Sequence, residues 1–314
     1  MRWMELCLDT PRAELDARCE ELAALGAGGF VIENEEDFRE FLENNRQYWD
    51  YVDRELEQSF SGLSRVKTYL PDDADGRALL EAIRARYPAA AVSFLEDSDW
   101  ENDWRKNYNP IEVGEKLVVV PEWEEAPPSG RVSLRLEPGL AFGTGSHPTT
   151  RMCLAALERW AGAGKRVLDL GCGSGILGIG ALLLGCESCV GCDIDPKAPD
   201  AAAANAALNS IGKDRFFVCA GDLVADASLR RRLGGGYDVV LANIVSDVII
   251  ALSPLVGAFL APYGVFIASG VIDGREEEVA AALRANGFEI TAHRREEEWH
   301  CFECVRESNE RSPL

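Results

Sequence analysis

Three glycines and an aspartate in the middle of the chain carry the chemistry that the sequence shows most clearly. Val167–Leu170 is a short apolar run, and Gly171, Gly173 and Gly175 follow it before a second apolar run. Glycine has no Cβ, so it can take positive φ and lets a ligand lie against the backbone. Asp193 ends the next apolar run, where a carboxylate can accept both hydroxyls of a ribose. The spacing predicts a strand, a glycine turn and a helix that bind a nucleoside.

The kind of nucleoside depends on Asp169, which lies at the end of the first predicted strand. Gly173, Gly175 and Gly178 also satisfy the G-x-G-x-x-G spacing of dinucleotide sites, a pattern that is weak on its own. A carboxylate facing the turn disfavours a pyrophosphate and suits the ammonium of a methionine moiety. No Gly-Lys-Ser or Gly-Lys-Thr follows, which excludes a P-loop. Together with Asp193, these residues resemble the S-adenosylmethionine (SAM) site of class I methyltransferases.

Alternating strands and helices from Gly164 onward must position these residues. Such alternation predicts a largely parallel sheet covered on both faces. The last two predicted strands are close together in the sequence and should form an antiparallel hairpin, which is the seven-stranded, Rossmann-like class I methyltransferase layout. The predicted strands are Val167–Leu170, Ser188–Gly191, Phe216–Cys219, Tyr237–Ala242, Gly264–Ser269, Phe288–Arg294 and Trp299–Val305.

The first 95 residues predict a separate, ferredoxin-like α+β domain, because a strand–helix–strand pattern occurs twice. Residues 33–51, between the two halves, are acidic and are expected to be irregular or partly helical. This region has no glycine-rich loop, so we assign residues 1–95 to substrate recognition; a stabilising appendage is the alternative. Residues 96–109 are expected to be a linker, and residues 110–314 the SAM-dependent methyltransferase domain. Lys116–Val120 and Val132–Leu136 are expected to form a hairpin.

Composition limits the partners and the compartment. The 314 residues carry a formal net charge of −21, which repels nucleic acid and anionic membranes and attracts a basic macromolecule. No apolar run reaches the roughly 18 residues of a membrane span, and the N-terminus lacks the apolar core of a signal peptide. We therefore expect a cytoplasmic protein, monomeric, with no direct contact to nucleic acid or membrane.

The cysteine spacings raise a zinc hypothesis. Cys186, Cys189 and Cys192 are each three residues apart, as are Cys301 and Cys304. Residues three apart on a strand point to opposite faces, so one metal ion cannot easily use both. We expect buried, reduced thiols and no metal site.

Two further segments face the predicted SAM site. The glycine-rich loop that starts at Pro138 precedes a helix expected from Pro148 to Trp160, and we expect Phe142 and Thr150 to close over SAM as a lid. His147 is expected to be a structural residue of that loop. Asn243 ends the fourth strand of the sheet and offers a side-chain oxygen and a backbone carbonyl to an amine N–H. Many amino-methyltransferases have Asn-Pro-Pro-aromatic there. Ile244 and Val245 replace the prolines here, which argues against a direct carry-over of base or amide methylation.

The lid sequence, the glycine turn, Asp193-Ile-Asp-Pro196, Ala242-Asn-Ile244 and Glu297-Glu-Trp299 together resemble the PrmA family over essentially the whole chain. The family methylates ribosomal protein L11 of the large subunit. The resemblance implies methylation of lysine ε-amines and an N-terminal α-amine. By matching position it assigns Thr150, Gly171, Asp193 and Asn243 to the SAM site, and Asp222 to the adenine.

Asn243 is the residue expected to act on the amine, and Asp169 and Gly173 complete the predicted cofactor site. Three alternatives remain open from the sequence. They are a class I methyltransferase of another protein or small-molecule amine, a SAM-binding module without catalysis, and a nicotinamide dehydrogenase. Asp169 disfavours the dehydrogenase.

Overall fold

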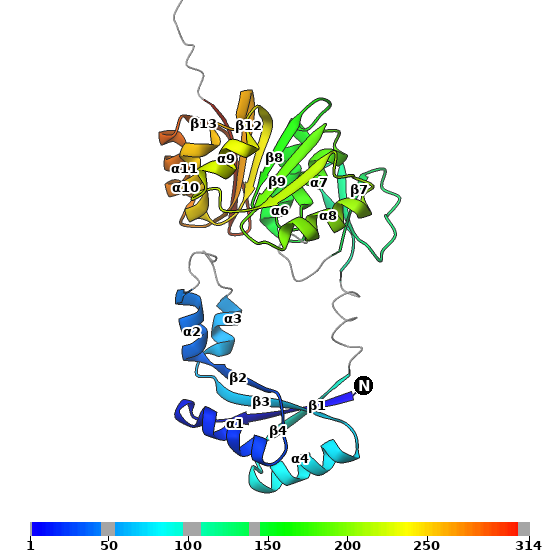
Figure 1. Cartoon of the computed structure of the whole chain (residues 1–314), viewed down its shortest axis with the longest axis vertical. Coiled ribbons are helices and arrows are strands. Elements are labelled where there is room, and N and C mark those ends of the chain that lie inside the picture. The colour runs from blue at the N-terminus through cyan, green and yellow to red at the C-terminus, as the bar shows by residue number, and fades with distance from the viewer. Residues whose placement is uncertain (1, 45–53, 97–107, 138–144, 307–314) are drawn as a thin grey trace, which may run out of the picture. The chain divides into compact units, whose positions relative to one another are not determined.

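The computed structural model describes residues 2–44, 54–96, 108–137 and 145–306 (Figure 1). Contacts between residues divide the chain into two units, Met1–Tyr108 and Asn109–Leu314. The expected linker, residues 96–109, lies almost entirely outside the described residues. Within the described ranges, no helix combines the length and the apolar character that crossing a bilayer requires.

Unit 1 contains a four-stranded antiparallel sheet with the order β2-β3-β1-β4. Its main elements are β1 (Arg2–Asp9), α1 (Leu15–Ala24), β2 (Phe30–Asn34), β3 (Ser64–Pro71), α4 (Ala74–Arg86) and β4 (Ala91–Glu96), with a 3₁₀ turn η1 (Arg12–Glu14) before α1. Alternate residues of β1, such as Met4 and Leu6, are buried against Leu22 of α1 and Ile83 of α4. The predicted ferredoxin-like architecture is confirmed.

The insertion between β2 and β3 is more regular than expected. It contains α2 (Glu35–Asn44) and α3 (Arg54–Phe60). The Asn34 side chain accepts a hydrogen bond from the backbone N–H of Asp37 at 2.7 Å, which caps the start of α2. The rings of Phe38 and Phe60 stack with centroids 4.2 Å apart and join the two helices. Some of the acidic residues that led us to expect irregular structure therefore form the first turn of α2, where negative charge is favourable.

Unit 2 contains a seven-stranded sheet with the order β10-β9-β8-β11-β12-β14-β13. Its strands are β8 (Arg166–Leu170), β9 (Ser188–Asp193), β10 (Phe216–Ala220), β11 (Tyr237–Asn243), β12 (Leu260–Ile272), β13 (Phe288–Glu296) and β14 (Trp299–Arg306). The first five in the spatial order are parallel, and β14 is antiparallel to both β12 and β13. All seven predicted strands and the final hairpin are confirmed, and with them the class I methyltransferase layout.

Helices cover both faces of this sheet (Figure 1). They are α6 (Pro148–Trp160), α7 (Ile176–Leu183), α8 (Ala198–Leu208), α9 (Ala227–Leu233), α10 (Ser246–Val256) and α11 (Glu276–Ala285). α8 begins at Ala198, and Pro199 fits its first turn.

The cysteines of unit 2 belong to two separate cores, one on each face of the sheet. Cys189 and Cys301 belong to the core under α6 and α7, and Cys192 and Cys304 belong to the core under α10 and α11. The prediction of opposite faces is therefore confirmed for the two pairs that lie on strands, whereas Cys186, which precedes β9, lies in the same core as Cys189. All ten cysteines of the chain are free thiols.

A three-stranded sheet precedes α6, and one prediction about it is wrong. β5 (Ile111–Val113) pairs antiparallel with β6 (Leu117–Pro121), but β6 pairs parallel with β7 (Val132–Leu136), with Leu117 opposite Val132. The expected hairpin of β6 and β7 does not form. Residues 122–131 bring the chain back to the level where β6 starts, as parallel pairing of consecutive strands requires.

Candidate functional site

The glycine turn between β8 and α7 has the predicted conformation. Gly171, Gly173 and Gly175 have φ of 72°, 48° and 80°, and Gly175 is the N-cap of α7. A Cβ on Gly171 would collide with Cγ2 of Ile244, so this position also requires a residue without a side chain. The turn therefore leaves its backbone open at the carboxyl end of β8.

Asp193 lies beside this turn at the end of β9. Its Oδ2 accepts a hydrogen bond from the N–H of Gly173 at 2.8 Å, and its Oδ1 accepts one from the N–H of Asp195 at 2.9 Å. A carboxylate has about four lone-pair positions. Each oxygen of Asp193 therefore retains capacity for a further donor, such as a ribose hydroxyl.

Asp169 is buried beneath the same turn, with 1% of its surface exposed. Its Oδ2 accepts a hydrogen bond from the N–H of Gly178 at 3.0 Å, whereas its Oδ1 is buried without a partner among the described residues. Burial raises the pKa of Asp169 to about 7; the Gly178 N–H opposes this shift, and the negative charge of Asp193 adds to it. The carboxylate form is therefore stabilised only if a donor or a cation approaches Oδ1.

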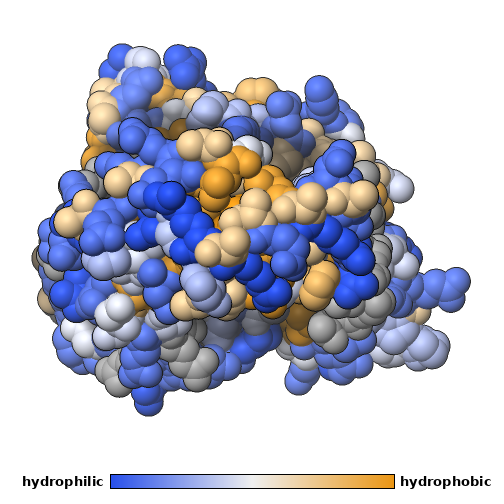
Figure 2. Space-filling view, turned by 90° about the horizontal axis from the view of Figure 1, so that it is seen from below, coloured by the Kyte–Doolittle hydropathy of each residue, from blue (hydrophilic) through white to orange (hydrophobic). Residues whose placement is uncertain are grey.

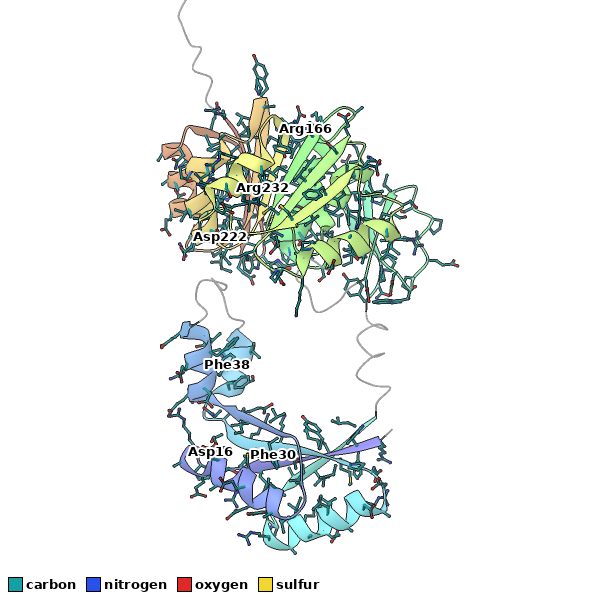
Figure 3. All side chains as sticks on the ribbon, viewed as in Figure 1. Asp16, Phe30, Phe38, Arg166, Asp222 and Arg232 are labelled. Carbon is teal, nitrogen blue, oxygen red and sulfur yellow. The ribbon has the colours of Figure 1, made fainter. Side chains whose placement is uncertain are left out.

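Asp222 follows β10 and lies next to Asp193, because the N–H of Gly221 donates to the Asp193 carbonyl at 2.7 Å. Its Oδ1 accepts hydrogen bonds from the N–H groups of Val224 and Ala225. Both of these hydrogen bonds use Oδ1, so Oδ2 can accept from a ligand. In Figure 3, Asp222 lies at the lower edge of the sheet and Arg166, at the start of β8, lies at the opposite edge.

Asn243 ends β11, and its amide contacts the first turn of α6. The Nδ2 group of Asn243 donates to Oγ1 of Thr150 at 3.3 Å. Thr150 is completely buried. These two residues are 93 positions apart in the sequence. The sequence analysis assigned each of them to the cofactor site, but it gave no indication that the two side chains contact each other.

His147 holds the beginning of α6, as expected for a structural residue. It is the N-cap, and its Nδ1 lies 2.7 Å from Oγ1 of Thr149. Its ring packs edge-on against Trp299, with centroids 4.8 Å apart. Burial lowers the pKa of His147, and the positive charge of Arg151 lowers it further. Nε of Arg151 donates to Glu296 at 2.8 Å, which joins α6 to the β13–β14 hairpin.

The expected site residues therefore meet along one edge. Gly171, Asp193, Asp222 and Asn243 lie at or just beyond the carboxyl ends of β8, β9, β10 and β11. The spatial order reverses at β8, which is where open α/β sheets bind ligands. Three aspartates at this edge suit a cationic ligand and disfavour a pyrophosphate. Phe142 lies outside the described residues.

One glycine-dependent contact near Asn243 was missing from the sequence interpretation. Gly270 has φ of 90°, and a Cβ there would collide with the carbonyl oxygen of Ile244. The available signal was a single glycine within a predicted strand, which often marks a close backbone approach.

Comparison with known proteins identifies the family. A family model described as ribosomal protein L11 methyltransferase (PrmA) matches residues 2–307. A ribosomal protein L11 methyltransferase of Heliobacterium modesticaldum is 39% identical over 302 residues, covering 92% of this chain and 93% of the relative. One from an Exiguobacterium species is 36% identical over 313 residues, covering 95% and 97%.

A solved structure gives the same result for part of the chain. The crystal structure of a ribosomal protein L11 methylase from Lactobacillus delbrueckii subsp. bulgaricus is 34% identical, with a TM-score of 0.57, and covers 63% of this chain and 99% of that chain. The matches span the carboxyl-edge residues described above as well as unit 1. The chain therefore belongs to the ribosomal protein L11 methyltransferase (PrmA) family.

Proposed function

We propose that this chain transfers methyl groups from SAM to amines of ribosomal protein L11, namely lysine ε-amines and the N-terminal α-amine. The observation that carries the proposal is the buried Oδ1 of Asp169, which has no donor among the described residues. Buried polar atoms are nearly always paired, so a ligand donor fits this position. The ammonium of a methionine moiety is such a donor, and its charge would stabilise the carboxylate.

The other residues of the carboxyl edge fit the rest of the cofactor. Asp193 has lone pairs left for the ribose hydroxyls, and Oδ2 of Asp222 can accept from the adenine amino group. Gly171 and Gly173 let the ligand lie against the backbone. The family resemblance adds Thr150 to this site, and the lid expected from the sequence adds Phe142. Bound there, SAM supplies a methyl group that is already activated by a positively charged sulfur.

The task left to the protein is to bind and orient a neutral amine. The unperturbed pKa of lysine is about 10.4, so at pH 7 roughly one side chain in 2,000 is neutral, and deprotonation costs about 4–5 kcal/mol. Good orientation supplies on the order of 7–11 kcal/mol. A dedicated general base is therefore not required. Oδ1 of Asn243 would accept an N–H of the amine and so direct its lone pair toward the methyl group.

Recognition of L11 is assigned to residues 1–95, with residues 96–109 as the linker and residues 110–314 as the SAM-dependent domain. The formal net charge of −21 favours a basic partner, and a ribosomal protein that binds RNA is basic. Hydrophilic residues dominate the face drawn in Figure 2, around a small apolar patch. We propose a cytoplasmic monomer without direct nucleic-acid contacts, which light scattering and RNA titration can test.

Mass spectrometry of purified L11 incubated with the protein and SAM tests the proposed reaction. Mass gains in multiples of one methyl group, mapped to lysines or the N-terminus, are expected. SAM binding without any mass gain on L11 would contradict the substrate assignment and direct the search to another basic protein.

A further inference from the structure

Two cysteine thiols face each other where β9 and β10 lie side by side. In the parallel pairing of these strands Cys192 is directly opposite Cys219, and the two thiols are in hydrogen-bond contact. Each thiol also reaches toward the other strand. Sγ of Cys192 lies 3.6 Å from the carbonyl oxygen of Gly221, and Sγ of Cys219 lies 3.7 Å from that of Gly191. The two side chains therefore cross the gap between the strands from both sides, which brings their sulfur atoms next to each other.

The spacing of the two strands allows an S–S bond between these cysteines but strains it. Neighbouring strands lie about 4.8 Å apart, within the Cα separation of disulfides, whereas the Cβ atoms of a disulfide lie about 3.8 Å apart. Oxidation must therefore draw Cys192 and Cys219 together by roughly 1 Å. A bond formed under such strain is easily reduced, which is typical of disulfides that regulate a protein.

The two thiols differ in their access to solvent. Cys219 is partly exposed, whereas Cys192 is completely buried. Burial raises the pKa of Cys192 to about 12, and the neighbouring Cys219 adds to this shift, although the positive charge of Arg232 on α9 opposes it (Figure 3). An oxidant therefore reaches Cys219 first, and Cys192 is the thiol that completes the bond.

A second pair of thiols provides an internal comparison. Cys153 of α6 and Cys301 of β14 are also in hydrogen-bond contact, but both are completely buried. Neither side chain is accessible to a dissolved oxidant. We therefore expect this pair to remain reduced under conditions in which Cys192 and Cys219 react.

The backbone of Cys192 holds the glycine turn of the proposed cofactor site. Its carbonyl accepts hydrogen bonds from the N–H of Gly171 at 2.8 Å and from the N–H of Cys172 at 3.3 Å. Asp193 follows directly in the chain, and its carboxylate accepts from the N–H of Gly173. Movement of Cys192 toward β10 therefore displaces both the turn and the carboxylate proposed to bind the ribose.

We propose that Cys192 and Cys219 are a redox-sensitive pair: a hydroperoxide oxidises them to a disulfide, which weakens SAM binding until a thiol reductant restores the two thiols. The effect on SAM rests on the proposed function, whereas formation of the disulfide does not.

The reaction takes two steps. The Cys219 sulfur attacks the peroxide, the O–O bond breaks, and a sulfenic acid and an alcohol form; with hydrogen peroxide the alcohol is water. The Cys192 sulfur then attacks the sulfenic sulfur, so that the S–S bond forms, the S–O bond breaks and water leaves. The two sulfur atoms lose two electrons, which reduce the peroxide, and the two thiol protons leave in the alcohol and the water.

Hydrogen peroxide added to the full chain tests whether the bond forms. Cleavage at lysine and arginine releases Cys219 as the one cysteine of residues 216–230, and Cys192 within residues 167–197. We expect mass spectrometry to find these two peptides joined, with the loss of two hydrogen atoms. Residues 167–197 contain four cysteines, so Cys192→Ala identifies the partner by abolishing the linkage.

Calorimetry measures the effect of the disulfide on SAM binding. We expect the Kd of the oxidised protein to be about tenfold higher than that of the reduced protein, because tenfold corresponds to about 1.4 kcal/mol, near the upper range of one net hydrogen bond at the turn. Dithiothreitol should restore the original Kd. Cys219→Ser should keep the Kd of the reduced protein before and after peroxide. Cys19→Ser, which removes another partly exposed thiol, is the matched control and should respond as the wild type does.

Three results would overturn the inference. Peroxide that leaves Cys192 and Cys219 unlinked, or that links Cys153 to Cys301 first, would exclude the redox-sensitive pair. A linked protein whose SAM Kd rises less than twofold would exclude control of the cofactor. A peroxide effect on Kd that persists in Cys219→Ser would assign that effect to another thiol.

The two kinds of failure are distinguishable. If the reduced protein does not bind SAM, the proposed function fails, and the peptide linkage still decides whether Cys192 and Cys219 form a disulfide. Thermal unfolding of each variant checks that the fold is intact.

Discussion

Titration of Asp169 should control SAM binding near neutral pH. Burial raises the pKa of this carboxyl from 3.8 to about 7. A shift of about three units corresponds to roughly 4 kcal/mol that disfavours the carboxylate in the ligand-free protein. The α-amino group of SAM, with a pKa of roughly 7.7–8.0, is mainly cationic at pH 7 and would stabilise the carboxylate. Binding below pH 7 therefore requires Asp169 to release its proton.

The magnitude follows from that equilibrium. If bound SAM keeps Asp169 ionised, the apparent Kd at pH 5.5 should be roughly 25-fold higher than at pH 7.5, given a ligand-free pKa of about 7. Calorimetry in buffers of different ionisation enthalpy should detect the proton released on binding at pH 6. Asp169→Asn should bind SAM roughly 10- to 150-fold more weakly at pH 7.5, the scale of a lost charged hydrogen bond. Its Kd should not change between the two pH values.

The free energy of unfolding of the protein without SAM should fall as pH rises, whereas SAM binding becomes tighter. The unfolded chain loses this proton near pH 4 and the folded protein near pH 7, so between those values the folded state binds more protons and stability falls as pH rises. Relative to wild type, Asp169→Asn should therefore gain about 3 kcal/mol more at pH 8 than at pH 5 in urea unfolding without SAM. A wild-type Kd that changes less than threefold between pH 5.5 and 7.5, or the same slope in Asp169→Asn, would refute this reasoning.

Three further predictions concern other parts of the chain. Asp193→Ala should weaken SAM binding by about 1.5–3 kcal/mol, because it removes the proposed acceptor of the ribose hydroxyls; an unchanged affinity by calorimetry would exclude Asp193 from the site. A truncated chain of residues 109–314, which contains the whole of unit 2 with its own two cores, should bind SAM but not methylate L11, and full activity would contradict a recognition role for unit 1. Glu303→Gln should lower the free energy of unfolding by about 2–3 kcal/mol in urea unfolding. This fully buried carboxylate accepts hydrogen bonds from Trp160 at 2.6 Å, Arg294 at 3.0 Å and Arg159 at 3.3 Å. A loss under about 1 kcal/mol would show that the partly exposed arginines are adequately hydrated without the carboxylate.

Local patterns were sufficient to predict the glycine turn after β8 and the position of Asp193 beside it. The glycine turn and Asp193 were predicted because the glycine spacing and the strand lengths that identify them lie within about 30 consecutive residues. The same holds for the seven strands, whose apolar runs are short and bounded by turns. The hydrogen bond from Gly173 to Asp193 then follows from the parallel pairing of β8 and β9.

Contacts that depend on packing could not be predicted in this way. The Asn243–Thr150 pair forms only after α6 has packed against the sheet, and neither residue has a sequence signal for the other. The direction of β7 relative to β6 was wrong because a strand pattern contains no information about direction. Glu303 lies in an alternating run that gives no sign of its burial. Its three partners come from α6 and β13, and only their convergence makes a charged residue tolerable there.

The position of β14 also constrains how the chain acquires its shape during translation. β14 separates β12 from β13 in the sheet, although both precede it in the sequence. Until Trp299–Arg306 has been synthesised, β12 presents a row of unpaired backbone groups, a feature that promotes wrong pairings. The buried partner of Arg159 and Trp160 is also missing until then. Completion of the catalytic sheet is therefore a late, long-range event on the nascent chain, and this half of the molecule is where a chaperone would be needed most.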